Sequence, residues 1–300
     1  MLMPHFVPAV TSQAHKKVGE RVMLATDTAA GSMTRDYTAP LWLIKLGALL
    51  NLAFMLTTPL PLAAGVDPWL VGSAQFIFAA SAYRCLFPVH YEHDVVFHDS
   101  VFSSIFITRT LATIKEIAFI YLMSRVLREL NTDHIPWIDG LSWLMMALVV
   151  IAECFVWGAV LLYRFQYYVY EESTWLFICI ANTAASLVLW QTTDHWDGRG
   201  LLLGFNFAFA LSYAPFQLLN LRFLWLNAIR NPAPAPGGRP LTARLLEGMW
   251  RSIRTKNRRT DPEAWGGWLG LLWMIGYFAT FVPAWMYCIA KVLAASVRTG

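Results

Sequence analysis

Long apolar stretches recur along the whole 300-residue chain, and they constrain its fold more than any other feature. A helix needs roughly 20 apolar residues to cross about 30 Å of hydrocarbon, since each residue advances it by about 1.5 Å. Hydrophobic residues make up 57% of the chain and charged residues 14%, a balance that is rare in a soluble domain. The sequence therefore predicts an all-α, polytopic helical membrane protein with seven spans, at residues 41–64, 69–87, 101–126, 137–163, 173–190, 200–226 and 264–295.

The first predicted span has the least regular end. Pro59, Pro61, Gly65 and Pro68 crowd the turn that follows it, and proline inside a helix removes a hydrogen bond. A re-entrant first segment, which enters and leaves the membrane on one side, is therefore the alternative to a complete span.

The positions of Lys and Arg between the spans predict the orientation, because cytoplasmic loops carry an excess of positive charge. Basic residues gather in the N-terminal tail and between spans six and seven, at Lys16, Lys17, Arg21, Arg35, Arg230, Arg239, Arg244, Arg251, Arg254, Lys256, Arg258 and Arg259. With seven spans, the N-terminus is expected in the cytoplasm and the C-terminus outside. The chain then divides into a partly disordered cytoplasmic tail (1–38), spans one to six (39–226), a cytoplasmic linker (227–263), and the seventh span with a short C-tail (264–300).

The cytoplasmic linker combines a spacer with an amphipathic segment. Residues 231–240 are rich in proline, which predicts a stiff connection without helix. From Leu241 to Ile253, apolar residues recur at helical spacing opposite Arg244, Arg251 and Arg254, which predicts a basic helix on the anionic inner leaflet. Membrane lipid is thus the expected partner, a calmodulin-like partner is less favoured, and the lack of aromatic-basic interleaving argues against nucleic acid. A T-x-x-E capping box that begins at Thr260 is expected to start the last span.

The third span carries Arg109, Lys115 and Glu116 among apolar residues. Each ionisable group at hydrocarbon depth costs roughly 2.5 to 3.5 kcal/mol, so such groups persist where they are paired or used. Arg109 and Glu116 are seven residues apart, on one stripe about 10 Å apart along the axis, and are expected to stack without direct pairing. Arg109 is instead expected to pair with Glu153 in span four. Glu116 is left without a cation, because Lys115 points away around the helix.

An unpaired buried carboxylate can carry a proton or act as a general acid or base. We therefore expect Glu116 and Glu153 to be catalytic carboxylates and Arg109 to orient the substrate. A fixed polar network that only specifies helix packing is the alternative. Polar and aromatic residues at comparable depth in spans five, six and seven are expected to bind the substrate: Asn182, Asn206, Tyr213, Trp273 and Tyr277.

The loop between spans two and three is rich in histidine and acidic residues. If residues 88–99 form a helix, His90, Asp94 and His98 share one face and make a possible three-ligand set for zinc or iron. A later loop on the same side would add Glu171 and Glu172. The alternative is a polar loop without metal, since residues 95–97 favour extended structure and the sequence has no H-E-x-x-H box.

Three classes of function fit these features. The favoured one is an intramembrane enzyme acting on a lipid-soluble substrate such as a terpenoid, sterol, quinone or acyl lipid. The second is a proton-coupled transporter or channel, with a relay through Glu116 and the pairs Asp133–His134 and Asp194–His195, and a hinge at Pro215. The third is a non-catalytic subunit of a membrane complex. The enzyme is favoured because the chain lacks the paired half-length segments of inverted-repeat transporters.

Overall fold

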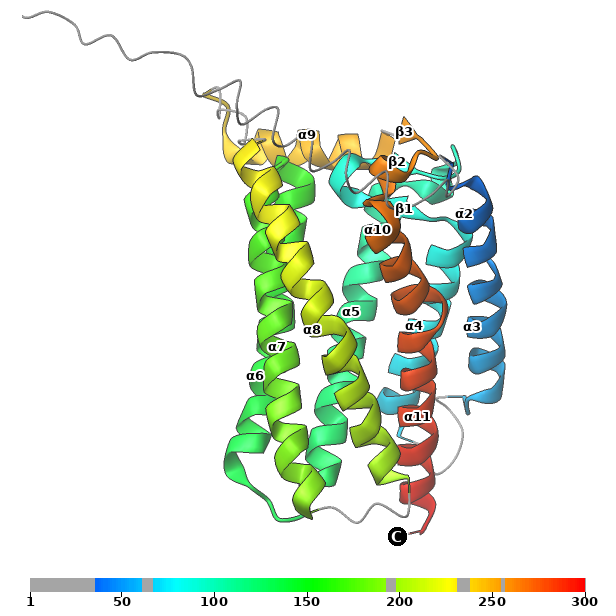
Figure 1. Ribbon diagram of the computed structural model, residues 1–300, viewed down its shortest axis with the longest axis vertical. Coiled ribbons are helices and arrows are strands. Elements are labelled where there is room, and N and C mark those ends of the chain that lie inside the picture. Colours follow the sequence, from blue (N-terminus) through cyan, green and yellow to red (C-terminus); the bar gives the residue numbers. More distant parts are fainter. Residues whose placement is uncertain (1–35, 61–66, 193–197, 231–237, 255–256, 300) are drawn as a thin grey trace, which may run out of the picture.

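The protein is an all-α bundle whose long helices run along its longest axis (Figure 1). The structure is a computed structural model that describes residues 36–60, 67–192, 198–230, 238–254 and 257–299. Most of the predicted N-terminal tail and the Asp194–His195 pair lie outside these residues. The helices are α2 (Thr38–Ile44), α3 (Leu46–Thr57), α4 (Pro68–Leu86), α5 (Ile105–Leu130), α6 (Pro136–Leu162), α7 (Phe165–Thr192), α8 (Arg199–Arg230), α9 (Leu241–Arg254), α10 (Gly267–Met274) and α11 (Phe281–Thr299).

Five helical stretches are long and apolar enough to cross a membrane: Thr38–Thr57, Pro136–Leu162, Phe165–Thr192, Arg199–Arg230 and Gly267–Ala294. The helix α5 has sufficient length, but its sequence is interrupted by charged residues, of which Arg109, Lys115 and Glu116 are buried in the bundle. This composition is that of a multi-pass membrane protein.

One long helix, α7, begins much earlier than the sequence predicted. The helix α7 begins at Phe165, well before the predicted span, so Glu171 and Glu172 lie in a helix instead of a loop. A hydropathy scale assigns charged residues such as these to a loop, because it counts their charge and contains no information on the polar interior that they face. The helix α8 continues through Pro215, the residue suggested as a hinge.

The last apolar stretch is interrupted near its middle. A π-helical turn, η4 (Ile275–Ala279), separates α10 from α11, and Thr280 then leaves helical geometry with φ −135° and ψ −81°. Two fully buried side chains bind carbonyl oxygens of this turn: Lys115 Nζ donates to Tyr277 O at 3.0 Å, and Asn51 Nδ2 donates to Phe278 O at 2.9 Å. Because unpaired backbone groups are costly in an apolar interior, these contacts stabilise the interruption.

At one end of the bundle, the amphipathic helix predicted from the linker is present as α9 and lies across the long helices (Figure 1). Ser104 Oγ donates to Ser252 O at 3.2 Å, and the Arg251 guanidinium donates to the Val160 carbonyl. A small sheet lies at the same end. Its strands are β1 (Val89–His90), β2 (Val95–Val96) and β3 (Asn257–Arg258), with β2 antiparallel to β1 and parallel to β3.

Short 3-10 helices connect these elements: η1 (Tyr91–His93), η2 (Val101–Ser103) and η3 (Pro262–Trp265). The residue that caps η3 is Asp261, whose carboxylate accepts from Ala264 N at 3.2 Å. The predicted cap at Thr260 is wrong. The Thr260 carbonyl oxygen instead accepts a hydrogen bond from Tyr37 N at 2.7 Å. This bond joins the start of the described chain to the segment before α10.

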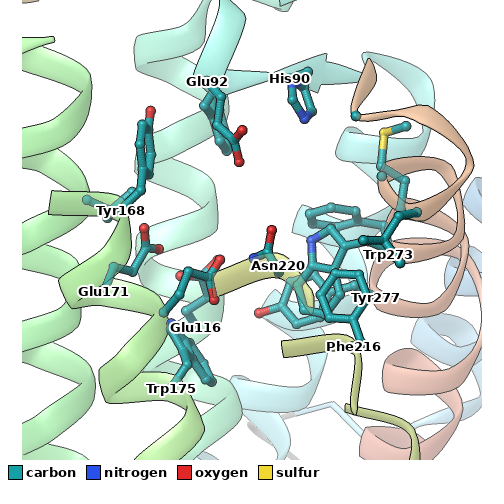
Figure 2. Close-up of a pocket in the computed structure, with 18 of the residues that line it drawn as sticks. His90, Glu92, Glu116, Tyr168, Glu171, Trp175, Phe216, Asn220, Trp273 and Tyr277 are labelled. Carbon is teal, nitrogen blue, oxygen red and sulfur yellow. The ribbon is translucent and has the colours of Figure 1, made fainter. Parts of the chain in front are cut away.

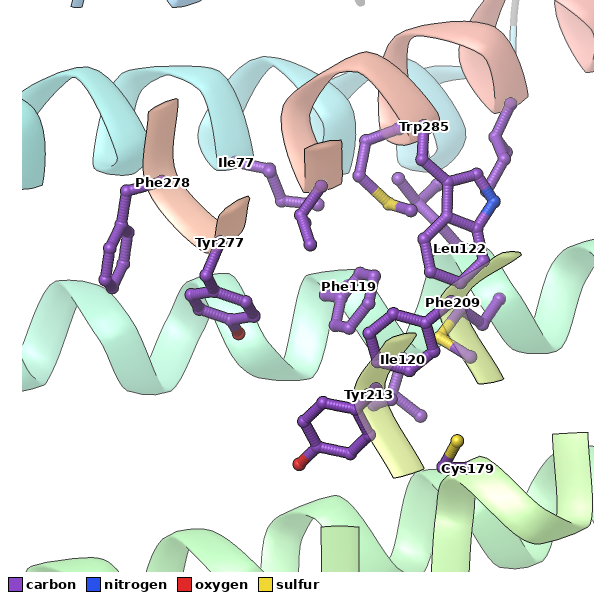
Figure 3. Packing of buried hydrophobic residues seen from close by; sticks show 14 of the residues in the cluster. Ile77, Phe119, Ile120, Leu122, Cys179, Phe209, Tyr213, Tyr277, Phe278 and Trp285 are labelled. Carbon is purple, nitrogen blue, oxygen red and sulfur yellow. The ribbon is translucent and has the colours of Figure 1, made fainter. Parts of the chain in front are cut away.

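The centre of the bundle is filled with aromatic side chains from three helices (Figure 3). Phe119 of α5 meets Phe209 of α8 at 6.0 Å and Trp285 of α11 at 5.5 Å between ring centroids, both nearly edge to face. Such contacts add about 0.5 to 1.5 kcal/mol to the free energy of area burial. This aromatic layer closes the middle of the bundle.

Close packing of α9 on α6 gives a first test. A Cβ atom at Gly248 would collide with the Leu161 carbonyl oxygen, whereas nothing lies within 4 Å of a Cβ atom at Gly140 in α6. We expect Gly248→Ala to lower the free energy of unfolding by about 1 to 3 kcal/mol through steric strain. Gly140→Ala should leave it unchanged or raise it slightly, because alanine favours helix. Thermal unfolding of both variants measures the change in stability. Equal stability of Gly248→Ala and Gly140→Ala would contradict the close contact between Gly248 and Leu161.

Candidate functional site

A cavity of about 190 Å³ lies between α5, α7, α8 and α10, and residues of β1 and η1 cover one end of it (Figure 2). Its two sides differ in chemistry. The carboxylates, called here the acidic wall, are Glu92, Glu116, Glu171 and Glu172. The rings, called here the aromatic wall, are Tyr213, Phe216, Trp273 and Tyr277. Figure 2 shows the Glu116 and Glu171 carboxylates across the cavity from the Phe216, Trp273 and Tyr277 rings.

Arg109 organises the buried charges. Its Nη2 atom donates to Glu153 Oε2 at 2.7 Å and to Glu153 Oε1 at 2.9 Å, so the predicted pair between spans three and four is confirmed. The same nitrogen donates to Glu116 Oε2 at 2.7 Å, so the expectation that Glu116 lacks a cation is wrong. The arginine side chain is long enough to reach along the helix to a group two turns away, which a comparison of backbone positions does not capture.

Glu153 lies behind Arg109, outside the lining of the cavity. Its Oε2 atom also accepts from Thr113 Oγ1 at 2.6 Å, and Thr113 Oγ1 in turn accepts from Trp157 Nε1 at 2.9 Å. Because Trp157 holds Thr113 and Thr113 holds Glu153, the Glu153 carboxylate fixes the orientation of the Arg109 guanidinium. Glu116, in contrast, both binds Arg109 and lines the cavity.

Glu171 and Glu172 belong to the acidic wall, although the sequence suggested them only as possible metal ligands in a loop. Glu171 Oε1 lies 3.9 Å from Arg109 Nη1, so one guanidinium faces carboxylates from α5, α6 and α7. Glu172 Oε2 accepts from Gln217 Nε2 at 2.5 Å, which ties α7 to α8. Both glutamates were predicted to lie in a loop beside the possible metal ligands. Their spacing after Tyr168 and before Trp175 would place them on an inward helical face, but only if α7 is started at Phe165.

Glu92 of η1 extends the acidic wall toward the end of the bundle, outside the membrane-spanning helices. Its Oε2 atom is buried and has no hydrogen-bond partner among the described residues. Burial, and to a smaller extent the negative charge of Glu172, raise the pKa of Glu92 to about 8. At neutral pH this carboxyl group is therefore mainly protonated in the folded protein.

Three of the five predicted substrate-binding residues lie in the aromatic wall: Tyr213, Trp273 and Tyr277. Trp273 stacks on Tyr277 with ring centroids 4.5 Å apart and on Phe216 with centroids 5.1 Å apart. Asn182 and Asn206 are buried but lie outside the lining of the cavity. Asn206 Nδ2 donates to Ser186 Oγ at 2.8 Å, so it joins α8 to α7.

The arrangement proposed for a metal does not form, because residues 88–99 are not helical. Strands β1 and β2 replace the helix, and Asp94 between them has left-handed backbone geometry with φ 52°. His90 consequently lines the cavity, Asp94 contacts Tyr163 and Arg251, and His98 packs on Trp42. Within the part of the chain that the structure describes, no three His, Cys, Asp or Glu residues gather as a metal site. The prediction that His90, Asp94 and His98 form a three-ligand metal site is therefore wrong.

Partly exposed lining residues lie on α8 and α10, and others lie on β1, η1 and α7, where His90, Tyr91, Glu92 and Glu172 are half-buried. Phe223 of α8 is 42% exposed, and Leu269 and Trp273 of α10 are half-buried. The neighbouring surface is apolar, with exposed Leu219 and Leu272. Such a surface beside the cavity suits an apolar ligand.

No protein-family model, no curated protein and no solved structure matches this chain.

The buried and exposed Arg–Glu pairs make a matched comparison. Arg109 Nη2 lies 2.7 Å from Glu153 Oε2 inside the bundle, and Arg239 Nη1 lies 2.9 Å from Glu247 Oε2 at the surface. We expect Arg109→Gln to lower the free energy of unfolding by about 3 to 5 kcal/mol, because it leaves buried carboxylates unpaired. Arg239→Gln should change it by less than about 1 kcal/mol. Unfolding by denaturing detergent, followed by tryptophan fluorescence, tests both, and similar losses would disprove the proposed importance of the buried pair.

The raised pKa of Glu92 predicts a pH dependence of stability. The group has an ordinary pKa of 4.5, and about 8 in the folded protein. Its contribution to stability is therefore fully present below about pH 4.5 and is lost as the pH rises through about 8. We expect the melting temperature of the native protein to fall more between about pH 5 and pH 9 than that of Glu92→Gln. Thermal scans across this range measure the difference, and parallel profiles would show that Glu92 is not perturbed.

Proposed function

We propose that this protein is a multi-pass membrane enzyme that binds a lipid-soluble substrate in the cavity and uses buried carboxylates for acid/base chemistry. The observation that carries the proposal is a cavity with an acidic wall facing an aromatic wall, next to two helices, α8 and α10, that have apolar exposed side chains. Terpenoids, sterols, quinones and acyl lipids are the substrate classes that fit such a cavity. A volume of about 190 Å³ suits the reacting end of such a molecule, with its remainder along α8 and α10.

Aromatic packing next to the cavity favours an enzyme over a transporter. Phe119 and Phe209 line the cavity, and beyond them Trp285 is fully buried and contacts both rings. Figure 3 shows the Phe119, Phe209 and Trp285 rings of this layer packed together. A transporter requires access to one site from both sides of the membrane, and the position of the aromatic layer disfavours that access.

The groups in the cavity divide into chemical and positioning roles. Glu116 is the proposed general acid or base, because it lines the cavity and is held by the Arg109 guanidinium at 2.7 Å. Arg109 also lines the cavity and orients polar groups of the substrate. Glu153 is a positioning residue that holds Arg109 from behind. The aromatic wall offers apolar surface to the substrate.

The proposed topology has seven spans with a cytoplasmic N-terminus. It is supported by the direction of α2–α3, α4, α5, α6, α7, α8 and α10–α11 along the bundle axis (Figure 1). The basic residues Arg239, Arg244 and Arg254 lie at the end of the bundle that carries α9, and the C-terminus is at the opposite end (Figure 1). The positive-inside rule assigns the α9 end to the cytoplasm, and the cavity then lies in the cytoplasmic half of the membrane.

Substitution of the proposed acid/base tests the function. The native protein is purified in polymer-bounded native membrane discs, and bound molecules enriched over bulk lipid are identified by mass spectrometry as candidate substrates. Conversion of these molecules is then followed with fresh protein. We expect Glu116→Gln to retain the bound molecule and to lower turnover by about 10²- to 10⁴-fold, because the amide cannot transfer the proton.

Glu247→Gln is the matched control, since Glu247 is an exposed glutamate on α9 that pairs with Arg239 at the surface. It should retain full turnover. Native turnover in Glu116→Gln would remove Glu116 from the mechanism. A cavity that retains no enriched molecule and converts none would contradict the proposed function.

A further inference from the structure

Proton exchange with water is a requirement that the proposed chemistry places on the cavity. A general acid or base returns to its starting state only when the proton that it gained or lost is exchanged with the solution. Glu116, the proposed acid/base, is only 7% exposed. The aromatic layer around Phe119 packs on one side of the cavity, and the exposed side chains of α8 and α10 beside it are apolar. Exchange therefore needs a polar route at another side.

Polar lining residues lie at the end of the cavity that faces α9. His90, Tyr91 and Glu92 of β1 and η1 are half-buried there, and Glu172 of α7 is half-buried as well. Within the acidic wall, Glu92 is the carboxylate that belongs to η1 and not to a long helix. In the proposed topology this end faces the cytoplasm. Glu92 is therefore the member of the acidic wall at the boundary with water.

Glu92 also lines a second, smaller cavity of about 10 Å³ at the same end of the bundle. The lining of this smaller cavity includes Asp94, Tyr163 and Arg251. Tyr163 is 41% exposed and the Arg251 side chain is 25% exposed, so this cavity lies close to the protein surface. A space of roughly 10 to 15 Å³ is what one water molecule needs. Glu92 thus lies between a water-sized space near the surface and the main cavity.

The Glu92 carboxyl group is suited to hold and to release a proton. Its Oε2 atom has no hydrogen-bond partner among the described residues. Charged and titratable groups line its two cavities from each neighbouring element: Arg84 of α4, Arg109 of α5, Arg164 between α6 and α7, Tyr168 and Glu172 of α7, and Arg251 of α9. Burial, and then the negative charge of Glu172, raise the pKa of Glu92 to about 8. Such a group exchanges protons readily near neutral pH.

The carboxylates around Arg109 can exchange protons with Glu92 across the main cavity. Oxygen atoms of Glu116 and Glu153 lie 2.7 Å from Arg109 Nη2, and Glu171 Oε1 lies 3.9 Å from Arg109 Nη1. Like charges so close together are not all ionised, so three carboxylates that share one guanidinium hold exchangeable protons among them. Figure 2 shows the carboxyl groups of Glu92, Glu116 and Glu171 directed into the cavity. Its volume of about 190 Å³ is large enough for water to bridge them.

We infer that Glu92 is a proton-relay residue, which passes protons between water at the α9 end of the bundle and Glu116 inside the cavity. When Glu116 takes a proton from the substrate, the proton moves through cavity water to Glu92, and Glu92 releases it to the water outside. When Glu116 donates a proton, the same steps run in reverse. The inference rests on the proposed function for the role of Glu116, and Glu92 acts through Glu116 without contacting the reacting atoms.

Proton entry can be measured without any substrate. Full-length protein in lipid nanodiscs at alkaline pH receives a pulse of protons released by light from a caged acid. Time-resolved infrared absorption follows protonation of the buried carboxylates, and the signal that is lost in Glu116→Gln identifies Glu116. We expect Glu92→Gln to slow protonation of Glu116 by at least about tenfold, because the amide cannot carry the proton inward.

The matched control for this measurement is Glu247→Gln, at an exposed glutamate on α9. It should show the native rate of protonation. Glu92 Oε2 has no hydrogen bond to lose, so Glu92→Gln is expected to fold, and a thermal scan checks this. Equal rates of protonation in Glu92→Gln and in the native protein would overturn the inference.

Rescue of turnover distinguishes a relay from a structural role. With the copurified substrate, Glu92→Ala should lower turnover by at least about tenfold and leave substrate affinity unchanged. Glu92→Asp should restore most of the turnover, because it keeps a carboxyl group. Formate is small enough to occupy the space that alanine leaves, and it should raise turnover of Glu92→Ala with increasing concentration but not that of Glu247→Ala. If neither aspartate nor formate restores turnover, Glu92 only supports the fold and the inference is overturned.

The outcomes separate this inference from the proposed function. Native turnover and native protonation rates in Glu92→Gln, together with lost turnover in Glu116→Gln, would remove the relay while the proposed function stands. Native turnover in Glu116→Gln would remove the proposed acid/base. Slow protonation in Glu92→Gln would even then show that protons enter the cavity through Glu92.

Discussion

A single buried guanidinium is the interaction on which the rest of this structure depends. Arg109 of α5 contacts carboxylates of α5, α6 and α7 through Glu116, Glu153 and Glu171. An isolated charge in an apolar interior is expensive, so these helices are stable together only when their polar faces meet. This requirement rotates α5 so that its charged residues face the interior. The polar centre of the bundle, and hence the cavity, follows from that orientation.

Not every buried polar group belongs to the candidate site. Lys115 and Asn51 bind backbone carbonyl groups of the π-helical turn between α10 and α11. Their role is to satisfy oxygen atoms that a continuous helix would have paired within itself. The turn nevertheless affects the site, because Tyr277 belongs to it and its ring lines the cavity. A structural lysine on one face of α5 and a candidate catalytic glutamate beside it thus serve the same cavity in different ways.

The cavity combines features that favour chemistry on a hydrophobic molecule. Carboxylates on one side can hold or transfer protons, and the stacked rings on the other side offer apolar surface to a substrate. The aromatic layer around Phe119 packs against the inner part of the cavity. On the outside, α8 and α10 expose apolar side chains beside it. A substrate would enter from the bilayer with its polar end first. The same low-polarity surroundings strengthen every electrostatic contact that it makes inside.

Hydropathy and helical periodicity specify which residues share a face. They were enough to predict the all-α class, the membrane-like composition, the amphipathic helix α9 and the pairing of Arg109 with Glu153. Only the tertiary structure placed Glu171 and Glu172 in a helix, brought Glu92 into the cavity, and joined Arg109 to Glu116. Periodicity reports backbone positions along one helix. It does not report how far a long side chain reaches, or which residues from distant segments meet, since helix packing decides both.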